Sequence, residues 1–199
     1  MTTKKYLQLY DKCPRPFWKK REKWEGSYFG ATIDWLKIRR FNKKLVNKYP
    51  WLIPSNRWSG MKITEAQNGG YWPGSPENIP DYDYEYTELD AMPIGWRIAF
   101  GDQMVEELGE ELRKANYDDE YRILDIKEKY GGLRWYDNSN TKEGYNIINK
   151  YENLSRTTCI CCGKPAKYIT LGWISPLCED CIKGVTDRYE TVEEYFGEK

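Results

Sequence analysis

The chain of 199 residues contains no histidine. This absence excludes Ser-His-Asp and Cys-His catalysis, the His-Glu-x-x-His zinc proteases and any histidine general base. An enzyme of this composition would have to use carboxylates, Tyr, Lys, Cys or a metal ion. No pair of carboxylates has a spacing that singles it out for acid–base catalysis. The sequence therefore predicts no catalytic residue and favours a binding protein over an enzyme.

Long apolar runs are absent as well. No stretch approaches the length of about 20 residues that a membrane-spanning helix needs, and the first residues lack the hydrophobic stretch of a signal peptide. We therefore expect a cytoplasmic protein with no membrane partner. Four of the six cysteines form two Cys-x-x-Cys pairs. This pattern fits a reducing compartment, where thiolates hold a metal ion, better than it fits disulfide scaffolding.

Charge is balanced over the whole chain but not along it. Residues 1–60 contain 15 Lys and Arg against 4 Asp and Glu, whereas residues 61–120 contain 4 against 15. The basic segment can serve nucleic acid, or the acidic segment can neutralise it within the same fold. Both interpretations stay open at this point.

Hydrophobic periodicity predicts an α+β fold of mixed helices with a small antiparallel sheet or hairpin. Helices are expected over Asp34–Asn47, Gly95–Asn116 and Lys142–Leu154, followed by a short final helix with a capping box of Thr191 and Glu194. A long irregular connection rich in Pro and Gly covers 51–80. We divide the chain into a basic aromatic helical segment (1–50), an α+β core (51–155) and a metal-binding module with a C-terminal helix (156–199).

Two predicted β segments supply candidate binding surfaces. The alternation over Asp81–Tyr86 predicts a strand that carries Asp81, Asp83 and Glu85 on one face. Arg122–Asp137 predicts a hairpin turned by Gly131 and Gly132, in which Lys129 opposes Arg134 and Lys127 opposes Tyr136. These last four side chains share the exposed face. The packing face holds Ile126, Tyr130, Leu133 and Trp135.

Each candidate surface has a functional and an ordinary interpretation. The cluster of Lys127, Lys129, Arg134 and Tyr136 can hold a phosphate, another anion or an acidic protein patch, or it is a solvated sheet face. The acidic strand can bind Mg²⁺ or imitate a nucleic-acid backbone, or its charges protect an exposed strand from aggregation.

The strongest motif is the cysteine quartet. The first pair is Cys159-x-x-Cys162, followed directly by Gly163, and the second is Cys178-x-x-Cys181. Fifteen residues separate Cys162 from Cys178, the spacing of a four-thiolate zinc site. Four protein ligands leave no open position for water, so we expect one structural Zn²⁺ ion in a zinc ribbon or a treble-clef-like module. Cys161 lies inside the first pair and offers an alternative register, whereas Cys13 stands alone. The apolar residues between the pairs, Trp173 and Ile174 among them, are expected to dock onto the core.

Several short motifs resemble an uncharacterised family of small bacteriophage and prophage proteins. They are Lys48-Tyr49-Pro50-Trp51-Leu52, the run 82–90, Pro93-Ile94-Gly95-Trp96-Arg97, the run 126–134 and the segment from Cys159 to Cys181. The resemblance covers about two thirds of the chain and brings no known activity or catalytic residue with it. It implies a context in which small accessory proteins inhibit host defence or modulate host machinery.

These features lead to one expectation and two alternatives. The expectation is a non-enzymatic, zinc-stabilised accessory protein that binds a host protein in the bacterial cytoplasm and inhibits a defence system. The first alternative is binding of nucleic acid or a nucleotide through the basic N-terminal segment and the face of Lys127, Lys129 and Arg134. The second is a Mg²⁺-dependent enzyme that uses the acidic run 81–90.

Overall fold

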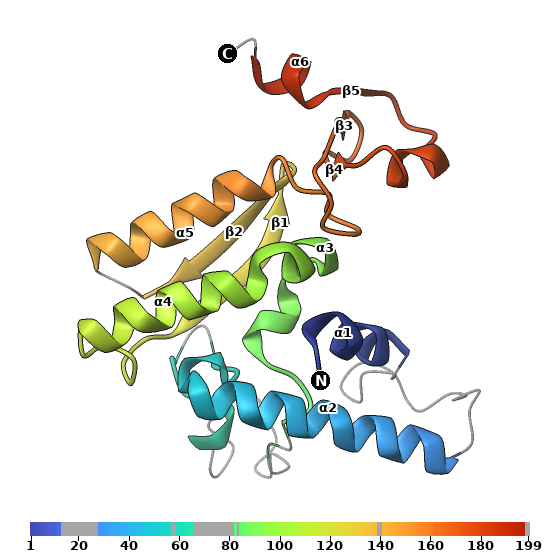
Figure 1. Cartoon of the computed structure of the whole chain (residues 1–199). Coiled ribbons are helices and arrows are strands. Elements are labelled where there is room, and N and C mark those ends of the chain that lie inside the picture. The colour runs from blue at the N-terminus through green and yellow to red at the C-terminus, as the bar shows by residue number, and fades with distance from the viewer. Residues whose placement is uncertain (13–27, 57–58, 66–81, 83, 139–140, 198–199) are drawn as a thin grey trace.

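The computed structural model describes residues 1–12, 28–56, 59–65, 82, 84–138 and 141–197, with the backbone alone for 10–12 and 28–34. It confirms mixed helices with small antiparallel sheets. Figure 1 shows three parts along the molecule. Helices α1 (Thr3–Lys12) and α2 (Tyr28–Lys48) lie at one end, a hairpin with two long helices lies in the middle, and the cysteine-containing segment lies at the other end.

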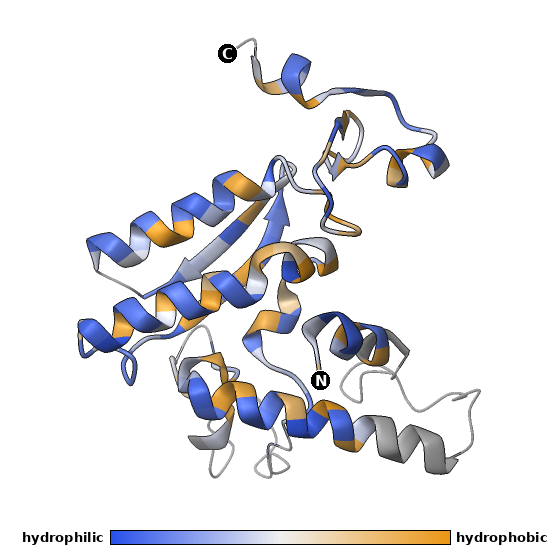
Figure 2. Cartoon of the chain, viewed as in Figure 1, coloured by the Kyte–Doolittle hydropathy of each residue, from blue (hydrophilic) through white to orange (hydrophobic). Residues whose placement is uncertain are grey.

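The central helix forms as the periodicity predicts, with one irregular turn. Its parts are α3 (Ile94–Trp96), a π turn (Arg97–Gly101) and α4 (Asp102–Lys114). Met104, Leu108 and Leu112 are fully buried at i, i+4 spacing, which appears as the apolar stripe of α4 in Figure 2. Burial of this stripe in the central core stabilises the helix far more than helix propensity does.

The predicted hairpin is present as β1 (Ile123–Lys129) and β2 (Gly132–Asp137), but its register differs. Tyr130 and Gly131 form the turn, both with positive φ (52° and 74°), as a two-residue type I′ turn requires. Gly132 is therefore already a strand residue. Lys127 opposes Arg134, and Asp125 opposes Tyr136.

The predicted pairings of Lys129 with Arg134 and of Lys127 with Tyr136 are wrong by two residues. Because side chains alternate with a period of two, this shift keeps every strand residue on its predicted face. Ile126, Leu133 and Trp135 are buried as expected, whereas Tyr130 leaves the packing face for the turn and is 68% exposed.

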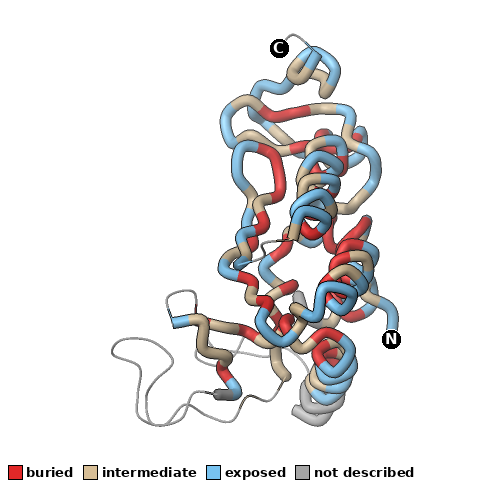
Figure 3. Tube along the Cα trace, turned by 90° about the vertical axis from the view of Figure 1, so that its left-hand side faces the viewer, coloured by how far each residue is buried: buried red, intermediate tan, exposed pale blue. Residues whose placement is uncertain are grey.

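Helix α5 (Lys142–Ser155) covers the free edge of β2 and packs against α4. The backbone N–H of Leu133 donates to Ser155 Oγ at 2.8 Å, and that of Trp135 donates to Glu152 Oε1 at 2.9 Å. These bonds satisfy strand donors that would otherwise be unpaired at a sheet edge. Figure 3 shows that buried residues run through this central part of the molecule.

Helix α2 contains the predicted helix Asp34–Asn47 and begins earlier, at Tyr28. Its last turn contributes Val46 to the central core, which also contains Tyr49, Trp51 and Leu52. A separate cluster joins α1 to α2, in which Tyr6 stacks on Phe41 with ring centroids 4.6 Å apart. The boundary expected at residue 50 therefore falls within a stretch that packs continuously, and the three-part domain division stays a prediction.

The strand expected over Asp81–Tyr86 is wrong for the residues that the structure describes there. Tyr84 has a φ of 59°, in the left-handed region, which a strand does not accommodate. The rings of Tyr82 and Tyr84 lie 5.1 Å apart and those of Tyr82 and Tyr86 lie 6.0 Å apart, so the aromatic side chains gather on one another. Asp81 and Asp83 lie outside the described residues.

Short 3-10 helices replace regular structure around this segment. They are Pro50–Leu52, Ile63–Glu65 and Glu88–Ala91. The described part of the predicted irregular connection also contains an isolated bridge between Ser55 and Lys62. Residues 57–58 and 66–80 of that connection lie outside the described residues.

The C-terminal part contains a three-stranded antiparallel sheet in the order β4-β3-β5. Its elements are β3 (Tyr168–Thr170), β4 (Pro176–Leu177), a 3-10 helix (Cys181–Gly184), β5 (Tyr189–Thr191) and α6 (Val192–Gly197). The predicted capping box is confirmed, since Glu194 N–H donates to Thr191 Oγ1 and Glu194 Oε2 accepts from Thr191 N–H. Across the part of the chain that the structure describes, no helix combines the length and apolarity needed to cross a membrane.

Candidate metal centre

Four cysteine sulfurs converge at one point of the C-terminal part. Cys159 and Cys162 lie in the loop that follows α5, Cys178 follows β4 directly, and Cys181 opens the 3-10 helix. Their Sγ atoms all lie within 4.8 Å of one another, and those of Cys162 and Cys178 are 3.5 Å apart. A tetrahedral ion with metal–sulfur bonds of about 2.3 Å separates its sulfurs by about 3.8 Å. The quartet therefore has the dimensions of a four-thiolate metal site.

The local backbone of the first pair explains why its two sulfurs meet. Gly163 has a φ of 79°, a conformation that glycine adopts without strain. The turn is closed by Gly163 N–H donating to Cys159 O at 2.9 Å and by Cys159 N–H donating to Lys164 O at 2.8 Å. The second pair is tied to the first, because Ile160 N–H donates to Pro176 O at 3.0 Å. The tail is therefore folded into one unit around the sulfurs.

Backbone N–H groups point at the sulfurs and favour the thiolate form. Burial alone raises the pKa of the Cys178 thiol, but the N–H groups of Cys181 and Asp180, together with the Cys162 sulfur, outweigh burial and lower that pKa to about 7. Burial raises the pKa of Cys162, against a hydrogen bond from Lys164 N–H that lowers it. A coordinated cation would supply the positive charge that lets all four thiols ionise.

Two hydrogen bonds join the first cysteine turn to α3, at the start of the central helix. Gly95 N–H donates to Ile160 O at 2.8 Å, and Trp96 Nε1 donates to Thr158 O at 2.9 Å. A Cβ atom at position 95 would lie only 2.2 Å from Cys159 O. Position 95 therefore has to be glycine for this turn to dock on α3, which Figure 1 shows directly below the cysteine-containing part.

A second contact joins the tail to the hairpin turn. Ile174 lies against Gly131, where a Cβ atom would approach Ile174 Cγ2 to 2.9 Å. The expected docking of the apolar segment between the pairs is thus present for Ile174. It is wrong for Trp173, which is 75% exposed.

The remaining two cysteines have different outcomes. Cys161 is exposed and lies outside the quartet, so the structure favours the register that pairs Cys159 with Cys162. Cys13 lies outside the described residues.

The predicted cationic face exists and is partly neutralised by neighbouring acids. Lys127 pairs with Asp125 and lies 4.8 Å from the centre of the Tyr136 ring. Arg134 lies 3.7 Å from Glu152 of α5. Lys129 Nζ lies 5.5 Å from the centre of the Tyr130 ring, so cations and exposed aromatic rings alternate along this hairpin.

The acidic residues of the run 81–90 that the structure describes contact other parts of the chain. Glu85 pairs with Arg39 at 3.5 Å. Asp90 accepts hydrogen bonds from Thr87 N–H at 2.7 Å and from Tyr6 Oη at 2.9 Å. Among the residues that the structure describes, the cysteine quartet is the one group of three or more metal-ligating side chains that lie close together. The Mg²⁺ hypothesis, which includes Asp81 and Asp83, stays a prediction.

Sequence reasoning missed two ionisable side chains that are shielded from solvent, one fully and one partly buried. Arg97 is fully buried under the ring of Tyr6, 3.7 Å from Asp90. It directly follows Trp96 and lies outside the apolar i, i+4 stripe of the helix, so the pattern did not predict its burial. Glu88 is partly buried and accepts from Ser55 N–H at 2.7 Å. The one available signal was the capping pattern Thr87-x-x-Asp90, which marks 88–90 as a helical turn and not a strand.

Comparison of the chain with protein-family models, with curated proteins and with solved structures found no match. Three of the short motifs noted in the sequence, within 93–97, 126–134 and 159–181, meet in the structure. Gly95 and Trp96 meet the first cysteine turn, and Gly131 meets the segment between the two cysteine pairs.

Proposed function

We propose that the cysteine quartet binds one structural Zn²⁺ ion and that the protein is a non-enzymatic binding protein. Zinc is supported by the donor set, because four thiolates in a closed tetrahedral arrangement suit Zn²⁺ and leave no position for a substrate. The module is a zinc ribbon or is treble-clef-like, with β3 and β4 between the pairs and a short helix at the second pair. Its role is to hold the tail against α3 and the hairpin turn.

The observation that carries the binding function is the exposed aromatic surface at the junction between hairpin and tail. Trp173 and Tyr130 are 75% and 68% exposed, and each directly precedes a residue of the contact between Ile174 and Gly131. Lys127, Lys129 and Tyr136 continue this surface along β1 and β2. Trp and Tyr are among the residues that contribute most to protein–protein interfaces, and the two lysines add positive charge at the edge of this surface.

The partner we propose is a host protein with an acidic patch, bound in the cytoplasm of a bacterial host. The resemblance to phage and prophage proteins supports this choice, because small accessory proteins of phages act on host defence and host machinery. Inhibition of a defence component by stoichiometric binding is the form of activity that we propose.

The test compares single substitutions of two exposed aromatic residues. Trp173→Ala removes the centre of the proposed surface, whereas Tyr145→Ala removes a ring that is 64% exposed on α5. Tagged wild-type and variant proteins are used to capture partners from bacterial lysate, and bound proteins are identified by mass spectrometry. A partner retained by the wild type and by Tyr145→Ala but lost with Trp173→Ala supports the proposal. Equal capture by all three proteins contradicts it.

Zinc is tested separately by elemental analysis of protein purified without added metal. One zinc per chain is expected, and the content should fall to background in Cys178→Ser. Another metal in stoichiometric amount would overturn the identity of the ion.

A further inference from the structure

A groove between α1 and α2 forms a second surface, at the opposite end of the molecule from the cysteines (Figure 1). It has a volume of about 460 Å³. Its charged lining consists of cations alone, and Phe41 and Leu45 form its apolar floor. The cations are Lys5, Lys37, Arg40, Lys44 and Lys48.

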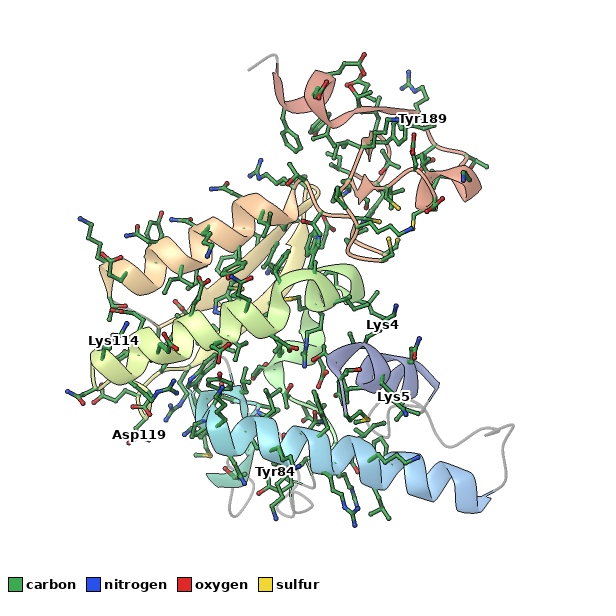
Figure 4. The ribbon with its side chains drawn as sticks, viewed as in Figure 1. Lys4, Lys5, Tyr84, Lys114, Asp119 and Tyr189 are labelled. Atoms are coloured by element: carbon green, nitrogen blue, oxygen red, sulfur yellow. The ribbon has the colours of Figure 1, made fainter. Side chains whose placement is uncertain are left out.

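The cations of α2 stand in one row. Lys37, Arg40, Lys44 and Lys48 follow one another at spacings of three and four residues, which places them on one side of a helix. With a rise of about 1.5 Å per residue, successive cations are about 4.5–6 Å apart along the axis and the row spans about 16 Å. Lys5 faces this row from α1, and Figure 4 labels it there. The groove therefore presents a line of positive charge with regular spacing.

Packing beneath the groove fixes the two helices. Tyr6 is fully buried, stacks on Phe41 and donates a hydrogen bond to Asp90 at 2.9 Å. Ile38 is fully buried in the same cluster. The position of Lys5 relative to the α2 row is thus set by the core and not by the surface charges, so the site needs no large rearrangement to bind a ligand.

Two cations in the middle of the row, Arg40 and Lys44, have no acidic partner among the described residues. Lys48 pairs with Glu106 at 3.2 Å at one end of the row. Ion pairs that involve α2 within the described residues include those of Arg39 with Glu85 and of Lys48 with Glu106, and neither includes Arg40 or Lys44. Adjacent cations of this kind repel one another, and a bound polyanion would relieve that repulsion.

We propose that this groove binds the phosphodiester backbone of a nucleic acid. The chemistry of the lining decides between nucleic acid and protein, because the charged side chains around the groove are hydrogen-bond donors with no acceptor among them. Phosphate oxygens are acceptors only, whereas a peptide brings one backbone N–H per residue that also needs a partner. The apolar floor accommodates the face of a sugar or a base. This activity is separate from the protein-binding surface at Trp173.

The experiment measures fluorescence anisotropy of short labelled single-stranded DNA, single-stranded RNA and duplex DNA at several salt concentrations. Wild-type protein is compared with Arg40→Gln and Lys44→Gln, and Lys114→Gln is the control because it removes one exposed positive charge at the far end of α4 (Figure 4). We expect Arg40→Gln and Lys44→Gln to weaken binding and to reduce the slope of log Kd against log salt by about 1 each. Lys114→Gln should leave both quantities unchanged.

The other outcomes refute the proposal. Equal losses in Lys114→Gln and Lys44→Gln would show that only the overall charge matters. Absence of binding to all three nucleic acids at low salt would remove the activity, and tighter binding of a labelled oligoglutamate peptide would assign the groove to an acidic protein. Trp173→Ala should bind nucleic acid like the wild type, so loss in that variant would place the site elsewhere. Thermal unfolding of each variant confirms that the substitutions leave the fold intact.

Discussion

The side chain of Glu88 provides the sharpest test of the buried architecture. It lies partly buried in the 3-10 helix Glu88–Ala91, where Ser55 N–H donates to its Oε1 at 2.7 Å. Burial raises the pKa of Glu88 from 4.5 to about 7; the hydrogen bond from Ser55 opposes this rise and the nearby carboxylate of Asp125 adds to it. The folded protein therefore holds a proton on Glu88 at pH values at which the unfolded chain has lost it.

The sign of the effect on stability follows from proton binding. Between pH 4.5 and about 7 the folded state binds more protons than the unfolded state, so the free energy of unfolding falls as pH rises. The contribution of Glu88 is fully present below its ordinary pKa of 4.5 and is lost as pH rises through about 7. The difference between these two pKa values corresponds to about 3 kcal/mol.

Glu88→Gln isolates this contribution. The glutamine keeps an oxygen that can accept from Ser55 N–H but carries no ionisable proton. We expect wild type and variant to have similar free energies of unfolding at about pH 4, and the variant to be more stable by about 3 kcal/mol at about pH 8. The assay is urea unfolding followed by tryptophan fluorescence at a series of pH values. Glu110→Gln is the control, because Glu110 is exposed on α4.

A constant difference between wild type and Glu88→Gln across the whole pH range would refute the reasoning. It would show that Glu88 keeps its charge in the folded protein and that the substitution acts only through packing. The same pH-dependent gain in Glu110→Gln would show that net charge, and not burial, is responsible.

Three further predictions concern the metal and the core. Removal of the metal with a strong chelator under reducing conditions should unfold the tail while the central helices persist, which circular dichroism and proteolysis can measure; unchanged protease resistance would contradict a structural metal. Gly95→Ala should destabilise the protein by about 3 kcal/mol or more, because the new methyl group would collide with Cys159 O. Gly184→Ala, which meets nothing within 4 Å, is its control in the same thermal unfolding assay. Asp90→Asn should cost about 3–5 kcal/mol in urea unfolding, because it leaves Arg97 buried without a counter-charge; a smaller loss would mean that water reaches Arg97.

Structural features that are set by residues a few positions apart in the sequence were predictable. The buried stripe of α4, the capping box at Thr191 and the short spacing within each cysteine pair all follow from local geometry. The cysteine quartet was predictable even though its halves are distant, because tetrahedral coordination by thiolates imposes a recognisable spacing. Local patterns thus located the candidate metal centre without any knowledge of the fold.

Features that depend on tertiary packing were not predictable. The hairpin turn uses Tyr130 and Gly131, because this register places Ile126 opposite Trp135 in the core and lets Glu128 accept from Gly131 N–H at 2.7 Å. The alternation over 81–86 suggested a strand, but the tyrosines pack on one another instead. No pattern in the sequence predicted that the guanidinium of Arg97 would be buried beneath the ring of Tyr6.

The backbone contact between α3 and the first cysteine turn has a consequence for how this chain can be divided. The indole N–H of Trp96 and the amide N–H of Gly95 both donate to residues that follow α5. A shortened protein that ends after α5 would therefore lose both acceptors and would expose the surface that the tail covers. The central part and the cysteine-containing tail therefore depend on each other. A fusion protein that contains either one needs the surface of the other to keep these hydrogen bonds.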